Sequence, residues 1–473
     1  MAFFNILSGI ACFEGGLPVA SFHAPPIRLL RHVPIPPEGK GVTATAPQPL
    51  DLRQVIAMGV GAMVGGGIFS VLGIAMLTAG HAAPLAFALG GVIALLTGNS
   101  YARLGLAFRS DGGSFTYLER AFRSKTVALL GGWLLLAGYV GTMALYAFTF
   151  GMYGAAMLGG GEGASAMHHL LQSLVLLVFL AINLYGVREA GNTELVIVTI
   201  KVLILALFAV IGVWHLEPGR LVPLFDRGVA GVVMAAALIF VAYEGFELIP
   251  NAIHEMEDPQ RNLARGIFWS IAITIALYVL VAIVAVGTLT TGTVQQYQEY
   301  ALAVAAKPFL GQAGFLFIGL AAVLSTASAI NATLFGTARL ASEMARSGAL
   351  PPVFAFRRCG DGIPWVSLLV ITGVTLLFVN AGTLTLISSF ASSTFLLLFL
   401  AINLSALRLR HVTGGSAVLP LAGMVLSAAS WVALMLYLGR ENPVELGWIV
   451  GFYAAAMAME GVFRVVRRFG ERN

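Results

Sequence analysis

Charged residues are scarce in this chain. Asp, Glu, Lys and Arg together make up 10% of its 473 residues, whereas 58% are hydrophobic. A soluble globular protein carries roughly 25% charged residues, so the composition argues against a soluble fold. It predicts an all-α polytopic membrane protein of about 12 helices, since a span needs about 20 apolar residues. The apolar stretches are 52–78, 83–102, 126–156, 167–187, 193–214, 228–253, 266–289, 313–340, 363–380, 383–407, 417–438 and 444–463.

Cysteine is nearly absent, and so are the usual motifs of catalysis. Cys12 and Cys359 are the two cysteines, and both are expected on the reducing side of the membrane, so we expect no disulfide. The eight histidines are scattered, and no His/Cys/Asp cluster has metal-ligand spacing. No phosphate-binding glycine loop or G-x-S-x-G elbow is present. We therefore expect neither an enzyme nor a bound metal or cofactor.

Basic residues exceed acidic ones, giving a net charge of +5. Their distribution follows the positive-inside rule, so a nucleic acid partner is not needed to explain them. One face collects the basic residues of the N-terminal region and of segments 103–125, 339–358 and 464–472, whereas the other keeps Arg220, Arg227, Lys307 and Arg440. We expect both termini in the cytoplasm and the protein in the cytoplasmic membrane. Residues 1–50 and 464–473 are expected to form cytoplasmic tails, the first of them flexible.

Glycines interrupt the first and the sixth apolar stretch. The run GVGAMVGGGIF, Gly59–Phe69, has three consecutive glycines, and AYEGFE, Ala242–Glu247, combines a glycine with two glutamates. These breaks head two blocks of five helices, 51–215 and 228–410, which 417–463 follows as a peripheral pair. Because each block has an odd number of helices, the two lie in the membrane with opposite orientations, as inverted repeats do.

The breaks need a reason, since glycine destabilises a helix relative to alanine. Non-helical backbone is tolerated at membrane depth where it is buried in protein or lines an aqueous cavity. Matched breaks in two halves therefore predict a transporter binding site near the bilayer midplane. The alternative is that the small residues let another helix pack closely.

Lys201 lies about midway along the fifth stretch, with apolar neighbours on both sides. A basic side chain at that depth costs about 2.5 to 3.5 kcal/mol on insertion scales and usually faces the bundle interior. Burial favours the neutral amine, so Lys201 is a candidate reversible proton carrier. The alternative is that its ammonium reaches an interface along its flexible stem.

Glu244 and Glu247 lie in the break of the sixth stretch. Glu244 could place its carboxylate near a cationic substrate or a proton path. Alternatively, either glutamate satisfies a free backbone N–H at the break or pairs with a base. Charged segments at helix ends, His254–Gly266 and Arg339–Pro352, are expected to be solvated caps and conformational latches.

Several motifs together resemble those of amino acid permeases of the amino acid-polyamine-organocation superfamily. They are GAMVGGGIF at 61–69, RSDGGSFTYLERAF at 109–122, IFVAYEGFELIPNAIHEMEDPQRNL at 239–263 and ARLASEMARSGALP at 338–351. The resemblance covers nearly the whole chain from Asp51 onward. It implies the 5+5 inverted-repeat fold of the leucine transporter, with helices 1 and 6 unwound and helices 3, 4, 8 and 9 as a scaffold.

The resemblance also implies a substrate site built on the backbone of the two breaks. The amides of Gly65, Gly66 and Gly67 are expected to bind a substrate carboxylate. The substrate ammonium is expected to meet the main-chain carbonyls of Met63, Val241, Ala242 and Glu244. Lys201 matches the fifth-helix lysine of family members that run on protons rather than sodium, which makes proton symport the expected coupling.

Three positions depart from the family pattern. Gly66 stands where many relatives have Ser or Thr, Val241 where a bulkier gate is common, and Glu244 where many relatives are aliphatic. These differences indicate a changed side-chain specificity, towards a cationic or larger substrate.

The expected function is import of amino acids by proton symport with alternating access, so the expected partners are an amino acid, protons and membrane lipids. The alternatives are a proton-independent exchanger of cationic amino acids or polyamines and, more remotely, an amino acid sensor.

Overall fold

The computed structural model describes residues 49–110, 112–122, 125–159, 164–186, 191–358 and 362–470. The described chain is helical throughout, without a β-strand, which confirms the all-α class. The expectations for residues 1–48, Cys12 and Cys359 lie outside these ranges. Residues 464–470 were expected in a tail, but they continue the last helix.

The first expected block contains a broken helix, four long helices and one short helix. Its elements are α2 (Leu52–Met63), α3 (Gly67–Ala79), η1 (Gly80–Ala82), α4 (Ala83–Phe108), the short α5 (Gly113–Phe122), α6 (Lys125–Met157), α7 (Ala164–Tyr185) and α8 (Gly191–Val213).

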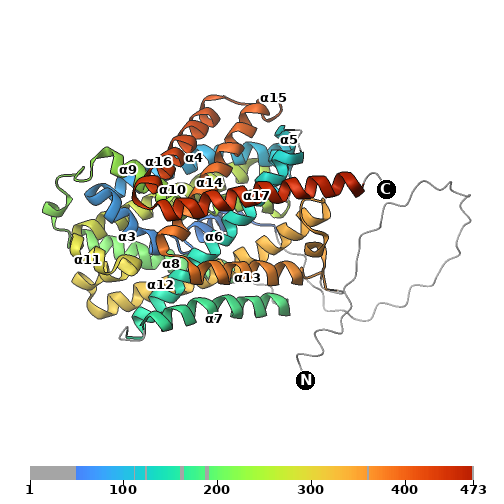
Figure 1. Cartoon of the computed structure of the whole chain (residues 1–473). Coiled ribbons are helices and arrows are strands. Elements are labelled where there is room, and N and C mark those ends of the chain that lie inside the picture. The colour runs from blue at the N-terminus through green and yellow to red at the C-terminus, as the bar shows by residue number, and fades with distance from the viewer. Residues whose placement is uncertain are drawn as a thin grey trace, which may run out of the picture.

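The second block repeats this order after η2 (Pro218–Leu221). Its elements are α9 (Gly228–Leu238), η3 (Phe240–Tyr243), η4 (Phe246–Glu255), α10 (Pro259–Thr288), α11 (Thr291–Gln296), η5 (Gln298–Tyr300), α12 (Ala301–Arg346), η6 (Pro352–Ala355), α13 (Trp365–Ala381) and α14 (Leu384–Arg408). The chain closes with α15 (Arg410–Thr413), α16 (Val418–Glu441) and α17 (Pro443–Gly470). The connecting helix α11 lies at the end of the bundle opposite the C-terminus (Figure 1).

The described residues contain eight helices that are long and apolar enough to cross a membrane, or nine if the bent pair 228–238 and 240–255 is one span. The expected count of twelve is therefore not confirmed. The reason is length: α2, α13 and the apolar part of α17 are shorter than a full span, and Gly67–Phe108 is one continuous 42-residue candidate. Each of the twelve expected stretches nevertheless falls on a helix or a broken helix.

Both predicted helix breaks are present. Asp51 starts α2 with a capping box, in which its side chain accepts from Gln54 N–H and Gln54 reaches back to the Asp51 amide. The helix ends at Met63, and α3 starts at Gly67 without a side-chain cap. The two helices therefore face each other across residues 64–66, where the amides of Gly65 and Gly66 have no helical partner.

The sixth span bends by 54° between α9 and η4. Gly245 sits at the bend with φ +124°, a conformation that favours glycine. A Cβ at this position would also lie 2.6 Å from the Cβ of Ala62 in α2. Both backbone strain and close contact with the first broken helix therefore require glycine here.

The breaks are enclosed by helices from both blocks. The expected scaffold helices α6, α7, α12 and α13 contact one another, α4 packs against α10, and α14 against α6 and α16. At the end of the bundle where α2 begins, Leu50 N–H donates to Glu255 O at 2.6 Å and Glu257 N–H to Leu50 O at 2.9 Å. This tether joins the start of the first broken helix to the end of the sixth.

Candidate functional site

The two breaks are in direct contact inside the bundle. A Cβ on Gly67 would lie 2.6 Å from Ala242 Cα, which shows how closely the two backbones approach. Met63, Gly65, Gly66, Gly67, Val241, Ala242 and Glu244 are all buried. The structure therefore brings all seven residues expected at the substrate site together, in an enclosed arrangement.

The glycine run presents unpaired donors. Within the described residues, the amides of Gly65, Gly66 and Gly67 donate no hydrogen bond. They lie at the N-terminus of α3, where backbone N–H groups and the helix dipole favour an anion. The Gly66 carbonyl faces the other way and accepts from Ser70 N–H at 3.0 Å and Ser70 Oγ at 2.6 Å. The run can thus receive a carboxylate, as expected.

Tyr146 of α6 covers this run and explains its glycines. A Cβ on Gly65 would lie 2.9 Å from Tyr146 Oη, and one on Gly66 would lie 2.5 Å from Tyr146 Cδ1. A side chain at Gly66 would also meet Thr326 of α12 at 2.9 Å. The departure from Ser or Thr at position 66 is therefore accompanied by an aromatic ring that fills the space a side chain would take.

Tyr278 of α10 joins the carbonyls of the two breaks. Its hydroxyl lies 2.7 Å from Met63 O and 3.1 Å from Ala242 O. The hydroxyl has one proton and each carbonyl has two lone pairs, so acceptor capacity remains for a ligand. This pair is half of the expected set of ammonium acceptors. A third, Val241 O, accepts from the Glu244 amide at 3.1 Å within the break.

Neighbouring helices hold the rest of the break backbone. Ser325 of α12 donates to Val64 O. Ser392 of α14 accepts from Val241 N–H at 3.0 Å and lies 2.8 Å from Leu238 O. These hydroxyls satisfy backbone groups that helix formation would otherwise satisfy, which is how irregular backbone persists in a membrane.

Lys201 is buried with 3% of its surface exposed, so its ammonium does not reach an interface. Its Nζ donates to Gly61 O in α2 at 2.7 Å. Gly61 precedes the glycine run by one helical turn, so α8 is tied to the helix half that leads into the break. The position fits the predicted coupling role, and that role stays a prediction.

Glu244 and Glu247 are neighbours, each 2% exposed. Glu244 Oε2 accepts from the Tyr146 hydroxyl at 3.2 Å. Glu247 Oε2 accepts from Gly245 N–H at 2.7 Å, at the start of η4, and its Oε1 has no hydrogen-bond partner among the described residues. Glu247 thus satisfies a free N–H at the break, one of the two roles considered for it, whereas Glu244 points towards the helix that covers the glycine run.

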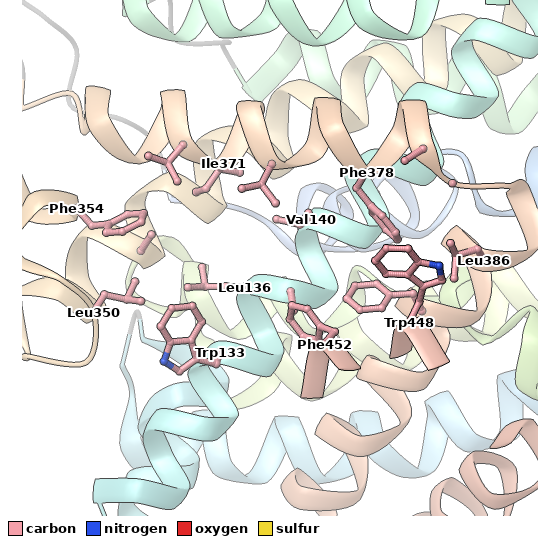
Figure 2. A pocket seen from close by; sticks show the side chains of 17 residues that line it. Trp133, Leu136, Val140, Leu350, Phe354, Ile371, Phe378, Leu386, Trp448 and Phe452 are labelled. Atoms are coloured by element: carbon pink, nitrogen blue, oxygen red, sulfur yellow. The ribbon is translucent and has the colours of Figure 1, made fainter. Parts of the chain in front are cut away.

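A separate hollow of about 360 Å³ lies between α6, α12, α13, α14 and α17. Figure 2 shows its apolar lining, with Trp133 and Phe354 towards one end and Leu386 and Trp448 towards the other. None of the predicted site residues lines it. A charged ligand would lose its hydration there without gaining partners, so this hollow does not compete with the breaks as a site for a zwitterion.

Sequence reasoning missed the residues that organise the breaks from other helices, namely Tyr146, Tyr278, Ser325 and Ser392. Each is an ordinary polar or aromatic residue in an apolar stretch, far along the chain from the glycines. The available signal was weak: a buried Tyr in a membrane helix needs a partner for its hydroxyl.

Matched broken helices whose backbone groups lack helical partners are typical of membrane transporters. Comparisons with known proteins agree with this class. The chain matches the amino acid permease family over residues 50–459. It is 31% identical to the inner membrane transport protein YbaT of Escherichia coli, over 85% of this chain and 94% of that protein. It is 29% identical to the methylthioribose transporter of Bacillus subtilis, over 69% of this chain and 74% of that one.

A crystal structure of a mutant manganese transporter of Eremococcus coleocola has the same fold. The TM-score is 0.53 with 14% identity, covering 88% of this chain and 95% of that one. This chain belongs to the amino acid permease family. It is a multi-span membrane transporter for amino acids or related substrates.

Proposed function

We propose that this protein imports amino acids across the cytoplasmic membrane by proton symport. The observation that carries the proposal is the meeting of the unpaired amides of Gly65, Gly66 and Gly67 with the carbonyls of Met63 and Ala242 in one buried site. The amides suit the α-carboxylate, and the carbonyls suit the α-ammonium. An amino acid presents these two groups whatever its side chain is.

Lys201 is the proposed proton site. A neutral amine and an ammonium differ in charge and in the number of donors, so protonation changes the strength of the bond between Lys201 and Gly61. That bond holds α2, the half of the broken helix that must move for the site to open. Protonation and helix movement are thereby linked.

Alternating access follows from the enclosed arrangement. The substrate site is buried, and the tether between Leu50 and residues 255–257 closes the end of the bundle where α2 begins. Following the positive-inside rule, we place this end and both termini in the cytoplasm. Breaking the tether would let α2 tilt and release substrate inward.

The test is uptake of a panel of labelled L-amino acids into proteoliposomes that contain the purified protein. An inward proton gradient, a sodium gradient and no gradient are compared, with Lys201→Ala in parallel. Accumulation driven by protons alone and lost in the variant supports the proposal. Flux that ignores both gradients, needs amino acid inside and survives the substitution refutes symport. Absence of uptake for every amino acid refutes the substrate class.

A second candidate, exchange of cationic amino acids or polyamines, is favoured by the buried neighbours Glu244 and Glu247. The hydroxyls and amides that donate to them, among them Tyr146 Oη and the Gly245 N–H, are neutral. A cationic substrate side chain would balance this charge. Glu244→Gln should then lose lysine, arginine or polyamine flux selectively, and an unchanged substrate profile would rule this candidate out.

A further inference from the structure

One phenol hydroxyl connects Glu244 to the glycine run. Tyr146 Oη donates to Glu244 Oε2 at 3.2 Å, and the same oxygen lies 2.9 Å from where a Gly65 Cβ would stand. The Glu244 carboxyl group is therefore a close neighbour of the amides proposed to receive the substrate carboxylate. This placement is unfavourable for two negative charges, because like charges repel strongly at short range in a buried site.

The groups around Glu244 come from three elements. They are Thr142, Tyr139 and Tyr146 in α6, Glu247 in η4, and Tyr278 in α10. Glu247 is the second carboxyl group among them, and when ionised it carries a charge of the same sign as ionised Glu244. A substrate carboxylate at the glycine run would add a second like charge next to Glu244.

The two carboxylates would also compete for one proton donor. A tyrosine hydroxyl carries a single proton, but it can accept a hydrogen bond while it donates one. If Glu244 is protonated, it can donate to Tyr146 Oη, which is then free to donate to the substrate carboxylate. The hydrogen bond between the two residues reverses its direction, and both carboxyl groups are satisfied.

We propose that Glu244 takes up a proton when the substrate carboxylate binds. The Tyr146 hydroxyl then accepts a hydrogen bond from Glu244 and donates its own proton to the substrate carboxylate. This inference rests on the proposed function. It adds a second proton site, in the sixth, broken span, to the one proposed at Lys201 in α8, and it explains why an acidic residue stands in a site for carboxylates. Glu247 differs from Glu244 in its partner, because the Gly245 amide that donates to its Oε2 cannot accept, so that hydrogen bond cannot reverse its direction.

The experiment measures binding of labelled L-amino acids to the purified full chain between pH 5 and pH 8. For wild type, the affinity for a neutral amino acid should fall by about tenfold per pH unit above the titration range of Glu244, since one proton is bound with each substrate. Glu244→Gln mimics the protonated acid, so it should bind with an affinity that does not vary with pH. Glu247→Gln is the matched control, since it removes an equally buried carboxylate, and it should keep the wild-type slope.

Proton uptake in weakly buffered solution gives a second readout. At a pH where Glu244 is ionised before substrate is added, substrate should remove about one proton per site from solution for wild type, Glu247→Gln and Lys201→Ala, and none for Glu244→Gln. If Glu244→Gln keeps the wild-type dependence of affinity on pH and the wild-type proton uptake, the inference is wrong, but the proposed transport function still stands. The inference is also wrong if Glu244→Gln loses only the binding of lysine and arginine. Wild type that binds no amino acid at any pH overturns the proposed function as well.

Discussion

Gly67→Ala tests whether the two breaks act as one site. The added Cβ would lie 2.6 Å from Ala242 Cα and 2.8 Å from Ala242 Cβ. Carbon atoms pack best at about 3.5 to 4.0 Å, so the breaks would have to separate by about 1 Å. The atom in the way belongs to the backbone of η3, so no side-chain rotation can relieve the clash. Overpacking of this kind costs about 1 to 3 kcal/mol.

The effect on transport should exceed the effect on stability. A misplacement of about 1 Å in a positioned site can cost about a hundredfold in rate, and this one moves the amides of the glycine run away from the carbonyl of Ala242. Initial uptake rates in proteoliposomes and thermal unfolding in detergent would be measured together. Gly336→Ala is the matched control, because a Cβ there meets nothing within 4 Å. If Gly67→Ala transports at the wild-type rate, the contact between the breaks is not part of the working site.

Two further substitutions address the hydrogen bonds around the breaks. Tyr278→Phe leaves the Met63 and Ala242 carbonyls without their hydroxyl, at a cost of about 1 to 3 kcal/mol in unfolding free energy, and it should also alter the KM for substrate. Tyr243→Phe, whose hydroxyl donates to Phe87 O at 2.7 Å, should lower stability in the same range and leave KM unchanged; equal KM effects would contradict the assigned role of Tyr278. Leu50→Pro removes the amide that donates to Glu255 O. Cysteine reporters placed at the α2 end of the bundle should then be labelled faster by a thiol reagent. Leu50→Ala keeps the amide, so its reporters should be labelled at the wild-type rate. Equal labelling of both would show that the tether does not close that end.

The breaks were predictable because their cause is local. Three consecutive glycines and a glycine between two glutamates are costly inside a helix, so the sequence itself marks the places where the backbone departs from it. Lys201 was predictable for the same reason, since its depth within an apolar stretch excluded solvent. The structure confirms both breaks and the burial of the lysine.

The partners of the breaks were not predictable, because they depend on which helices meet. Tyr146 and Tyr278 lie in long apolar stretches whose aromatic residues mostly pack in the core. Their roles arise from contacts across 98 and 215 residues of chain, and no local pattern encodes such a contact. The number of spans was difficult for a different reason. The break leaves α2 too short for a full span and lets α3 run on into α4 as one candidate, and α13 and the apolar part of α17 are short as well.

The contacts of α2 indicate how the bundle can change shape. This 12-residue helix half is held by the Lys201 ammonium at Gly61, by the Tyr278 hydroxyl at Met63 and by the tether at Leu50 just before it. Each contact is a hydrogen bond to the backbone carbonyl or amide of the α2 segment, and each comes from a different element: α8, α10 and the end of η4. A neutral hydrogen bond contributes about 0.5 to 1.5 kcal/mol and one from a charged group about 1.5 to 3 kcal/mol, so contacts of this strength suit a segment that detaches and returns in the proposed cycle. The other half, α3, is also held by the Tyr153 hydroxyl at Phe69 and by packing against α9. In the proposed cycle, α2 is the half that moves and α3 is the half that stays with the scaffold, so the amides proposed to bind substrate lie on the side of the break that stays.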